Sequence, residues 1–164
     1  MSDALDVWSE FNVAMVGATA ALAGLLIVAM SVNISVIMTS ATLPARAASS
    51  IAALVLAIVA SAFGLVPGQP VAAYGIEVLV AAVLAGVFQW HVIIVVARED
   101  DIPTRDRIAK GFLGVLPIAG FLIGAVLVLA GAVEAGLIAM AVGAMLSIIS
   151  ALTLAWVVLV EVLR

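Results

Sequence analysis

The sequence predicts an all-α membrane protein, a single bundle of five transmembrane helices, and two observations carry this prediction. The first is composition, because 67% of the 164 residues are hydrophobic and only 10% are charged, against about a quarter charged in an average soluble domain. Too few polar side chains exist to cover a surface that faces water. The second is the presence of five apolar stretches, each long enough to cross a hydrocarbon core of about 30 Å.

The first two predicted spans cover residues 13–38 and 47–66, and neither contains a charged residue. The first is too long for the core of a signal peptide. It is also preceded by acidic residues where a signal peptide carries Lys or Arg, so we expect it to be retained. Turn residues around Pro44 separate the two spans, and Pro67 and Gly68 end the second.

The third predicted span covers residues 73–97 and ends at a charged loop, residues 98–110. The rest of the chain must hold two spans, because one helix of that length would be about 80 Å long. Gly131, Glu134 and Gly136 mark the break between them, which places the fourth span at 111–130 and the fifth at 137–163.

Five crossings put every Lys and Arg of the chain on one side of the membrane: Arg46, Arg98, Arg105, Arg107, Lys110 and Arg164. The other side receives only acidic residues. The positive-inside rule then predicts an external amino terminus and a cytoplasmic carboxyl terminus in a multi-pass protein of the cytoplasmic membrane.

Small residues at helical spacing predict where helices pack, since close approach drives association in lipid. The fifth span carries a five-membered stripe, and the fourth has a GxxxG pair; together these are Ala139, Gly143, Ser147, Ala151, Ala155, Gly120 and Gly124. The first span has similar pairs, Ala14/Ala18, Gly17/Ala21 and Ala20/Gly24. Packing within one bundle and contact between subunits of a homo-oligomer are both open. Pro117, between Gly114 and Gly120, predicts either a static kink or a hinge.

Polar residues of the first predicted helix share one face, because Asn12, Thr19 and Asn33 fall on a seven-residue grid. They are candidates for lining an aqueous path, or for hydrogen bonding to neighbouring helices.

Glu77 and His91 lie fourteen residues apart on the third span and are candidates for a proton relay. The alternative is that both simply reach the membrane interfaces. With no cysteine, one histidine and an acidic net charge, we expect no enzyme activity, no cofactor, no metal site and no nucleic-acid partner.

Several stretches resemble a family of uncharacterised bacterial integral membrane proteins. They are Val16-Gly17-Ala18, the run from Ala20 to Ala29, Ser31-Val32-Asn33, Arg46, the run from Leu65 to Gln69, and Trp90. The resemblance covers roughly the first 90 residues. It implies a bacterial cytoplasmic membrane and five spans, and it carries no activity.

The leading functional prediction is an oligomeric, channel-like pathway for ions or small solutes, lined by the first span. Because the external side offers only acidic residues, cations would be favoured. One alternative is an accessory or scaffold subunit that binds another membrane complex through the fifth-span stripe and the loop at 98–110. The other is a proton-coupled carrier that uses Glu77 and His91.

Overall fold

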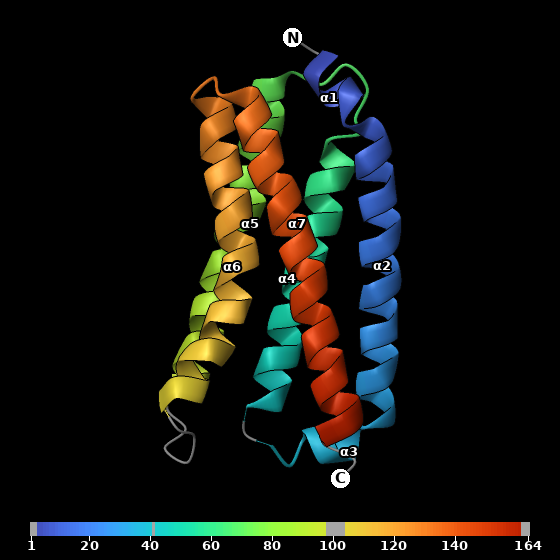
Figure 1. Cartoon of the computed structure of the whole chain (residues 1–164), viewed down its shortest axis with the longest axis vertical. Coiled ribbons are helices and arrows are strands. Elements are labelled where there is room, and N and C mark those ends of the chain that lie inside the picture. The colour runs from blue at the N-terminus through green and yellow to red at the C-terminus, as the bar shows by residue number, and fades with distance from the viewer. Residues whose placement is uncertain (1–2, 41, 98–103, 162–164) are drawn as a thin grey trace.

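Every element of the described residues is helical, which confirms the all-α prediction for that part of the chain (Figure 1). The computed structural model describes the backbone of residues 3–40, 42–97 and 104–161, and the side chains of residues 4–35, 37–40, 42–97 and 114–159. In chain order the elements are α1 Asp3–Val7, α2 Ser9–Val32, α3 Ile34–Ile37, α4 Leu43–Phe63, α5 Val71–Ala97, α6 Thr104–Leu129, α7 Val133–Trp156 and a π-helical turn, η1 Val157–Glu161.

The long helices alternate in direction, so the amino terminus lies at one end of the bundle and the carboxyl terminus at the other (Figure 1). Four stretches of the described chain are long and apolar enough to cross a membrane: Ser9–Val32, Leu43–Phe63, Val71–Ala97 and Val133–Leu159. In α6 the described apolar part, Gly114–Leu129, is shorter and corresponds to about 24 Å of helix.

Most of the long helices begin several residues before the predicted apolar stretches, in segments that contain polar residues. The helix α4 begins at Leu43 because Pro44, which can occupy only the first turn of an undistorted helix, starts it. The helix α6 begins at Thr104, within the charged segment. The helix α2 ends at Val32, and Asn33 separates it from the single turn of α3.

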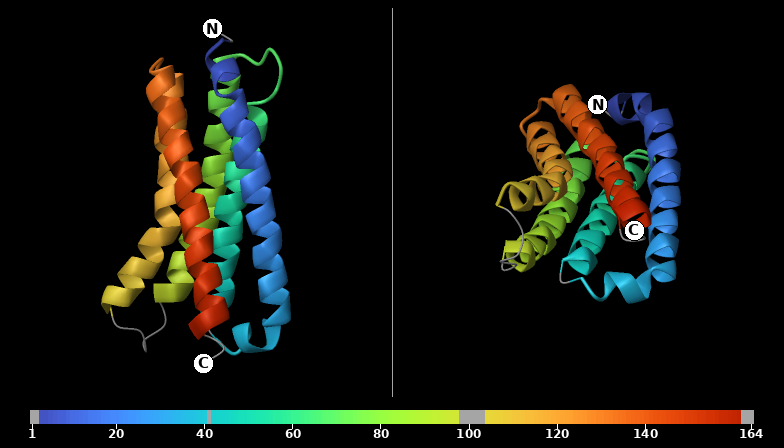
Figure 2. Two further views of the ribbon diagram at one scale, coloured as in Figure 1. Left: turned by 45° about the vertical axis from the view of Figure 1, so that its right-hand side comes forward. Right: turned by 60° about the horizontal axis from the view of Figure 1, so that its bottom comes forward.

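The helices α4 and α7 form the centre of the bundle, and α2 and α5 lie further out. The buried share of the apolar stretch is 44% in α4 and 50% in α7, against 22% in α2 and in α5. The most extensive helix contact joins α6 to α7, followed by the α5–α6 and α2–α4 contacts. Figure 2 shows α7 crossing the middle of the bundle when it is viewed from the end.

Buried side chains fill the interior from end to end. The largest core cluster lies toward the amino-terminal end and includes Tyr74, Val78 and Phe121. Two smaller clusters continue toward the carboxy-terminal end, one around Leu54 and one around Leu26. Because these side chains are at most 3% exposed, the centre of the bundle is closed by packing.

The helix α6 changes direction along its length. In Figures 1 and 2 its second half runs beside α7, whereas its first half diverges from the bundle. Pro117 lies inside this helix and is buried. A proline removes one backbone hydrogen bond and bends a helix, so the position of Pro117 agrees with a kink. The hinge motion stays a prediction.

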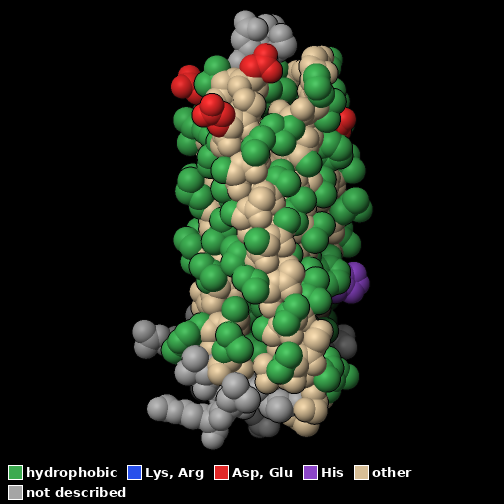
Figure 3. Space-filling view, turned by 90° about the vertical axis from the view of Figure 1, so that its right-hand side faces the viewer, with side chains coloured by type: hydrophobic (Ala, Val, Ile, Leu, Met, Phe, Trp, Pro, Cys, Tyr) green, Lys and Arg blue, Asp and Glu red, His purple; other side chains and the backbone are tan. Residues whose placement is uncertain are grey.

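The outer surface is mostly hydrophobic, with acidic side chains gathered at the amino-terminal end of the face shown in Figure 3. Large apolar side chains such as Val80, Leu84 and Ile138 are about half exposed or more. A surface of this size and apolarity is compatible with lipid and costly in water. The described part of the chain is thus a helical bundle of the kind that membrane proteins form.

Candidate functional site

The three predicted pore residues on α2 lie inside the bundle of the chain itself. Asn12 is 6% exposed, Thr19 is fully buried and Asn33 is 8% exposed. Thr19 Oγ1 donates a hydrogen bond of 2.5 Å to Met15 O, and Asn33 Nδ2 donates one of 3.0 Å to Ala29 O. Two of the three polar groups are therefore bonded to the backbone of their own helix.

Apolar side chains interrupt this polar face. Ala23 and Leu26 lie on the same buried side of α2 as Thr19 and Asn33, and they belong to the core clusters. The face thus consists of separate polar positions within packed hydrocarbon, turned toward the neighbouring helices of the same chain.

Asn12 differs from the other two because its side-chain amide has no hydrogen-bond partner in the described part of the chain. It lies directly over the end of α4, where a Cβ on Gly64 would be only 2.5 Å from Asn12 Nδ2. The glycine leaves the space that the amide occupies. This approach brings the start of α2 against the carboxy-terminal end of α4.

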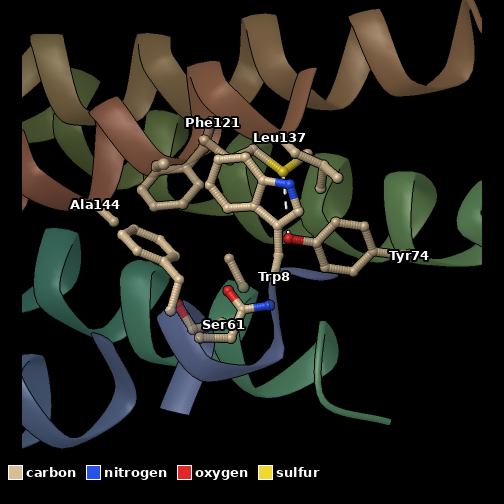
Figure 4. A pocket seen from close by; sticks show the side chains of 11 residues that line it. Trp8, Ser61, Tyr74, Phe121, Leu137 and Ala144 are labelled. Atoms are coloured by element: carbon tan, nitrogen blue, oxygen red, sulfur yellow. Dashed lines mark hydrogen bonds between the residues drawn. The ribbon is translucent and has the colours of Figure 1, made fainter. Parts of the chain in front are cut away.

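Asn12 lines a small cavity, which we call the amino-terminal pocket. Its other walls include Trp8, Ser61 of α4, Tyr74 of α5 and Met140 of α7. Its volume is about 10 Å³, close to the minimum that a single water molecule needs. Figure 4 shows the Tyr74 hydroxyl and the Trp8 indole pointing into the same region, with Ser61 on the opposite side from Phe121 and Leu137.

The Tyr74 hydroxyl has one partner within the chain, the sulfur of Met140, at 3.3 Å. A thioether is a weak acceptor, so this contact satisfies the hydroxyl only in part. The pocket therefore gathers four polar groups, from Asn12, Ser61, Tyr74 and the indole N–H of Trp8, among aromatic and aliphatic walls.

A second buried polar contact joins α4 to α5, where Ser49 Oγ donates a hydrogen bond to Gln89 Oε1. The two side chains are 6% and 4% exposed. A Cβ on Gly114 of α6 would collide with both, at 2.4 Å from Gln89 Nε2 and 2.9 Å from Ser49 Oγ. The glycine that the sequence associates with the Pro117 kink thus leaves the space that these two side chains occupy.

Sequence reasoning missed this pair and the pocket, since Ser49 and Ser61 carry no motif and Gln89 lies beside interfacial residues. The available signal is a glutamine inside an apolar span, because an amide at membrane depth needs a partner. The partner itself cannot be identified from spacing.

The predicted proton-relay residues are not brought together. Glu77 is half-buried near the start of α5 and accepts a hydrogen bond from Gln69 Nε2, while Gln69 Oε1 is buried without a partner. His91 is exposed, and its Nδ1 lies 3.0 Å from Val87 O of its own helix. Fourteen residues of helix place the two groups about 21 Å apart.

The small-residue stripe on α7 meets different neighbours along its length. A Cβ on Gly143 would lie 3.0 Å from Pro117 O on α6, whereas Ala151 packs with Ala23 of α2 and Leu54 of α4. A spacing of four residues drifts by about 40° per step, or about 160° over the whole stripe. One straight partner helix cannot follow such a rotation, which is why the stripe passes from α6 to α2 and α4.

Small residues of α2 are also exposed on the outside of the bundle. We define the outer face of α2 as its exposed small residues: Ala14, Gly17, Ala18, Ala20, Ala21 and Gly24. A Cβ on Gly17 or Gly24 would meet nothing within 4 Å. Further along α2, an open groove of about 440 Å³ lies beside the contact between α2 and α7 and is lined by apolar side chains of both helices and by Asn33.

The charged loop predicted as a docking site, residues 98–110, lies outside the described residues from 98 to 103, and only its backbone is described from 104 onward. In the described part of the chain, no three His, Asp or Glu side chains are grouped so that they could hold a metal ion. Comparison with family models, with curated proteins and with solved structures gives no match for this chain.

Proposed function

We propose that the chain crosses the cytoplasmic membrane five times and acts as a non-catalytic accessory subunit that binds a transmembrane helix of another membrane protein. The outer face of α2 is the binding surface. The observation that carries this proposal is the contrast between α2 and the other described helices, because among the glycines described within long helices only Gly17 and Gly24 of α2 are exposed with open space beside them.

The alternating direction of the helices supports five crossings, in which α6 is the fourth along the chain and adds to the four long apolar stretches (Figure 1). Asp6, Glu10 and Glu134 are exposed at the amino-terminal end, whereas Arg46 lies in the first turn of α4 at the other end. The positive-inside rule therefore favours a cytoplasmic carboxy-terminal end and an external amino terminus.

Helix association in lipid depends on close backbone approach, because lipid tails are as apolar as leucine. Glycine and alanine permit this approach, and within this chain the α6–α7 contact uses them in that way. The outer face of α2 offers the same surface to lipid, about 180° around the helix from the buried side chains of Asn12 and Thr19. A helix from another protein is the occupant that such a surface fits.

The closed interior favours assembly over conduction. A pathway along Asn12, Thr19 and Asn33 would run through side chains buried between helices, two of them bonded to their own backbone. The ion-pathway and proton-carrier predictions can be tested together by flux through purified protein in liposomes. We expect neither ion nor proton flux above protein-free liposomes, and a flux that Asn33→Leu or Glu77→Gln changes would overturn the proposal.

Crosslinking in native membranes tests the binding surface directly, because the chain has no cysteine. Single cysteines introduced by Gly17→Cys or Gly24→Cys and labelled with a thiol-directed photocrosslinking reagent are expected to crosslink to a membrane protein of another kind. The matched controls are Val80→Cys and Leu84→Cys, on the exposed face of α5, which should give no adduct.

The mass of the adduct decides between partners. An adduct of twice the mass of the chain would show that a second copy occupies the face, and it would replace the accessory function with self-association. Equal crosslinking from α2 and α5 would show random collision in the membrane and contradict the proposal.

A further inference from the structure

We infer that the amino-terminal pocket binds a single water molecule held by Asn12, Ser61 and Tyr74. This inference is independent of the proposed function, because it concerns the interior of the bundle and not the outer face of α2.

Two side chains of the pocket are largely buried and have no hydrogen-bond partner among the described residues. Asn12 is 6% exposed and Ser61 is 5% exposed, and no described side chain or backbone group makes a hydrogen bond to either. A buried amide or hydroxyl without a hydrogen bond is costly, more so in a protein surrounded by hydrocarbon. Both side chains line the same pocket, so one ligand can satisfy both.

The Tyr74 hydroxyl supplies a third hydrogen-bond partner for a water molecule. The Tyr74 hydroxyl donates its proton to the sulfur of Met140, which leaves the lone pairs of its oxygen able to accept a hydrogen bond. The Asn12 amide and the Ser61 hydroxyl can each donate or accept. Three partners match the number of hydrogen bonds that a buried water molecule usually makes.

Size and charge restrict the ligand further. The volume of about 10 Å³ is close to the space that one water molecule needs. No carboxylate is among the residues that line the pocket, and Asp6 and Glu10 are exposed to the outside of the bundle. A cation would have to give up its hydration for three neutral groups, so a neutral ligand is favoured.

The water molecule would connect three helices at one point. Asn12 belongs to α2, Ser61 to α4 and Tyr74 to α5, and these helices meet beneath the short helix α1. Leu5 of α1 is 4% exposed and belongs to the same core cluster as Tyr74. The water therefore completes the polar contacts under the amino-terminal segment.

Solid-state NMR in lipid bilayers can test this site, because the chain contains only two asparagines, Asn12 and Asn33. With 15N-labelled asparagine, the measurement is the rate at which magnetisation passes from water to each side-chain amide. We expect transfer to Asn12 in the wild type, despite its burial. In Ser61→Val, where a methyl group enters the pocket and one partner is lost, the transfer should fall by about fivefold or more.

Asn33 serves as the internal reference, and its transfer rate should not change. The matched control is Ser150→Val, since Ser150 is 6% exposed on α7 and does not line the pocket. If Ser61→Val does not fold, Tyr74→Phe removes one partner and keeps the shape of the wall, with the same expected loss.

The inference is overturned if Asn12 receives no magnetisation from water in the wild type, or if its transfer is unchanged in both variants. It is also overturned if replacing sodium with ammonium salts shifts the Asn12 signals, because that would place a cation in the pocket.

Discussion

The α6–α7 contact and the outer face of α2 are built from the same residue types at the same spacing, yet they have opposite surroundings. A Cβ on Gly120 of α6 would lie 2.7 Å from the Cα of Gly143, so the two backbones touch. A Cβ on Gly17 of α2 would meet nothing within 4 Å. Small residues at four-residue spacing therefore permit two helices to approach closely. Whether a contact forms depends on whether another helix lies beside that face.

The largest expected effect is that of Gly120→Leu. The colliding atoms belong to the backbone of α7 and cannot move aside as a side chain can. We expect the free energy of unfolding to fall by about 3 kcal/mol or more, which thermal unfolding in detergent would measure. An unchanged melting temperature would show that α6 and α7 are not in backbone contact.

Gly17→Leu should leave the stability of the purified protein unchanged but weaken binding to a partner. Its side chain enters open space, so the unfolding of the purified protein should be unchanged. It would, however, block the approach of a partner helix, and crosslinking from Gly24→Cys should fall about tenfold, equivalent to about 1.4 kcal/mol. The matched control is Val13→Leu on the same helix, whose original side chain is already large and 61% exposed. Unaltered crosslinking in Gly17→Leu would remove the outer face of α2 as a binding surface.

Buried serines allow a similar comparison between a hydrogen bond that joins two helices and one within a single helix. Ser49→Ala removes a donor that joins α4 to Gln89 of α5 and leaves that amide oxygen unpaired. We expect the unfolding free energy to fall by about 0.6–2 kcal/mol. Ser147→Ala is the matched control, because its hydroxyl is equally buried but bonds to Gly143 O of its own helix at 3.0 Å. Equal losses in the two variants would contradict the importance of the link between helices.

The smallest effect is expected for Gly24→Ala. No atom lies within 4 Å of the added Cβ, and alanine is the better helix former, so stability should be unchanged or rise by about 0.5–1 kcal/mol. The same substitution at Gly124, where the Cβ would lie 2.7 Å from Gly136 O, should be destabilising. If Gly24→Ala lowered the free energy of unfolding as much as Gly124→Ala, the outer face of α2 and the α6–α7 contact would not differ in packing.

Composition and the positions of turn residues were sufficient to predict the helical class and the approximate positions of the long helices. The first and last residues of the helices were harder to predict. Hydropathy shows where a chain is apolar, but not where its helical backbone hydrogen bonds end. Thr104 illustrates this, because α6 begins there within a charged segment. Asn33 illustrates the converse, because α2 ends there within an apolar one.

For the candidate site, the seven-residue grid predicts that Asn12, Thr19 and Asn33 share one face, and all three are buried, but spacing could not tell a face that lines a path from one that packs inward. That distinction depends on what the neighbouring helices present. Ala23 and Leu26 fill the space between the polar positions, and Ser61 and Tyr74, distant in the chain, come to lie against Asn12.

The sequence by itself determined that the protein is helical and apolar enough to be compatible with a membrane, because composition and turn chemistry act locally along the chain. Only the tertiary structure decided which small-residue faces are occupied, that the α7 stripe passes from α6 to α2 and α4, and that Asn12 meets Ser61 and Tyr74 in one pocket. The physical reason is that lipid tails are as apolar as the helix surfaces, so burying a particular face gives no hydrophobic gain. Which faces pair therefore depends on close packing between segments distant in sequence.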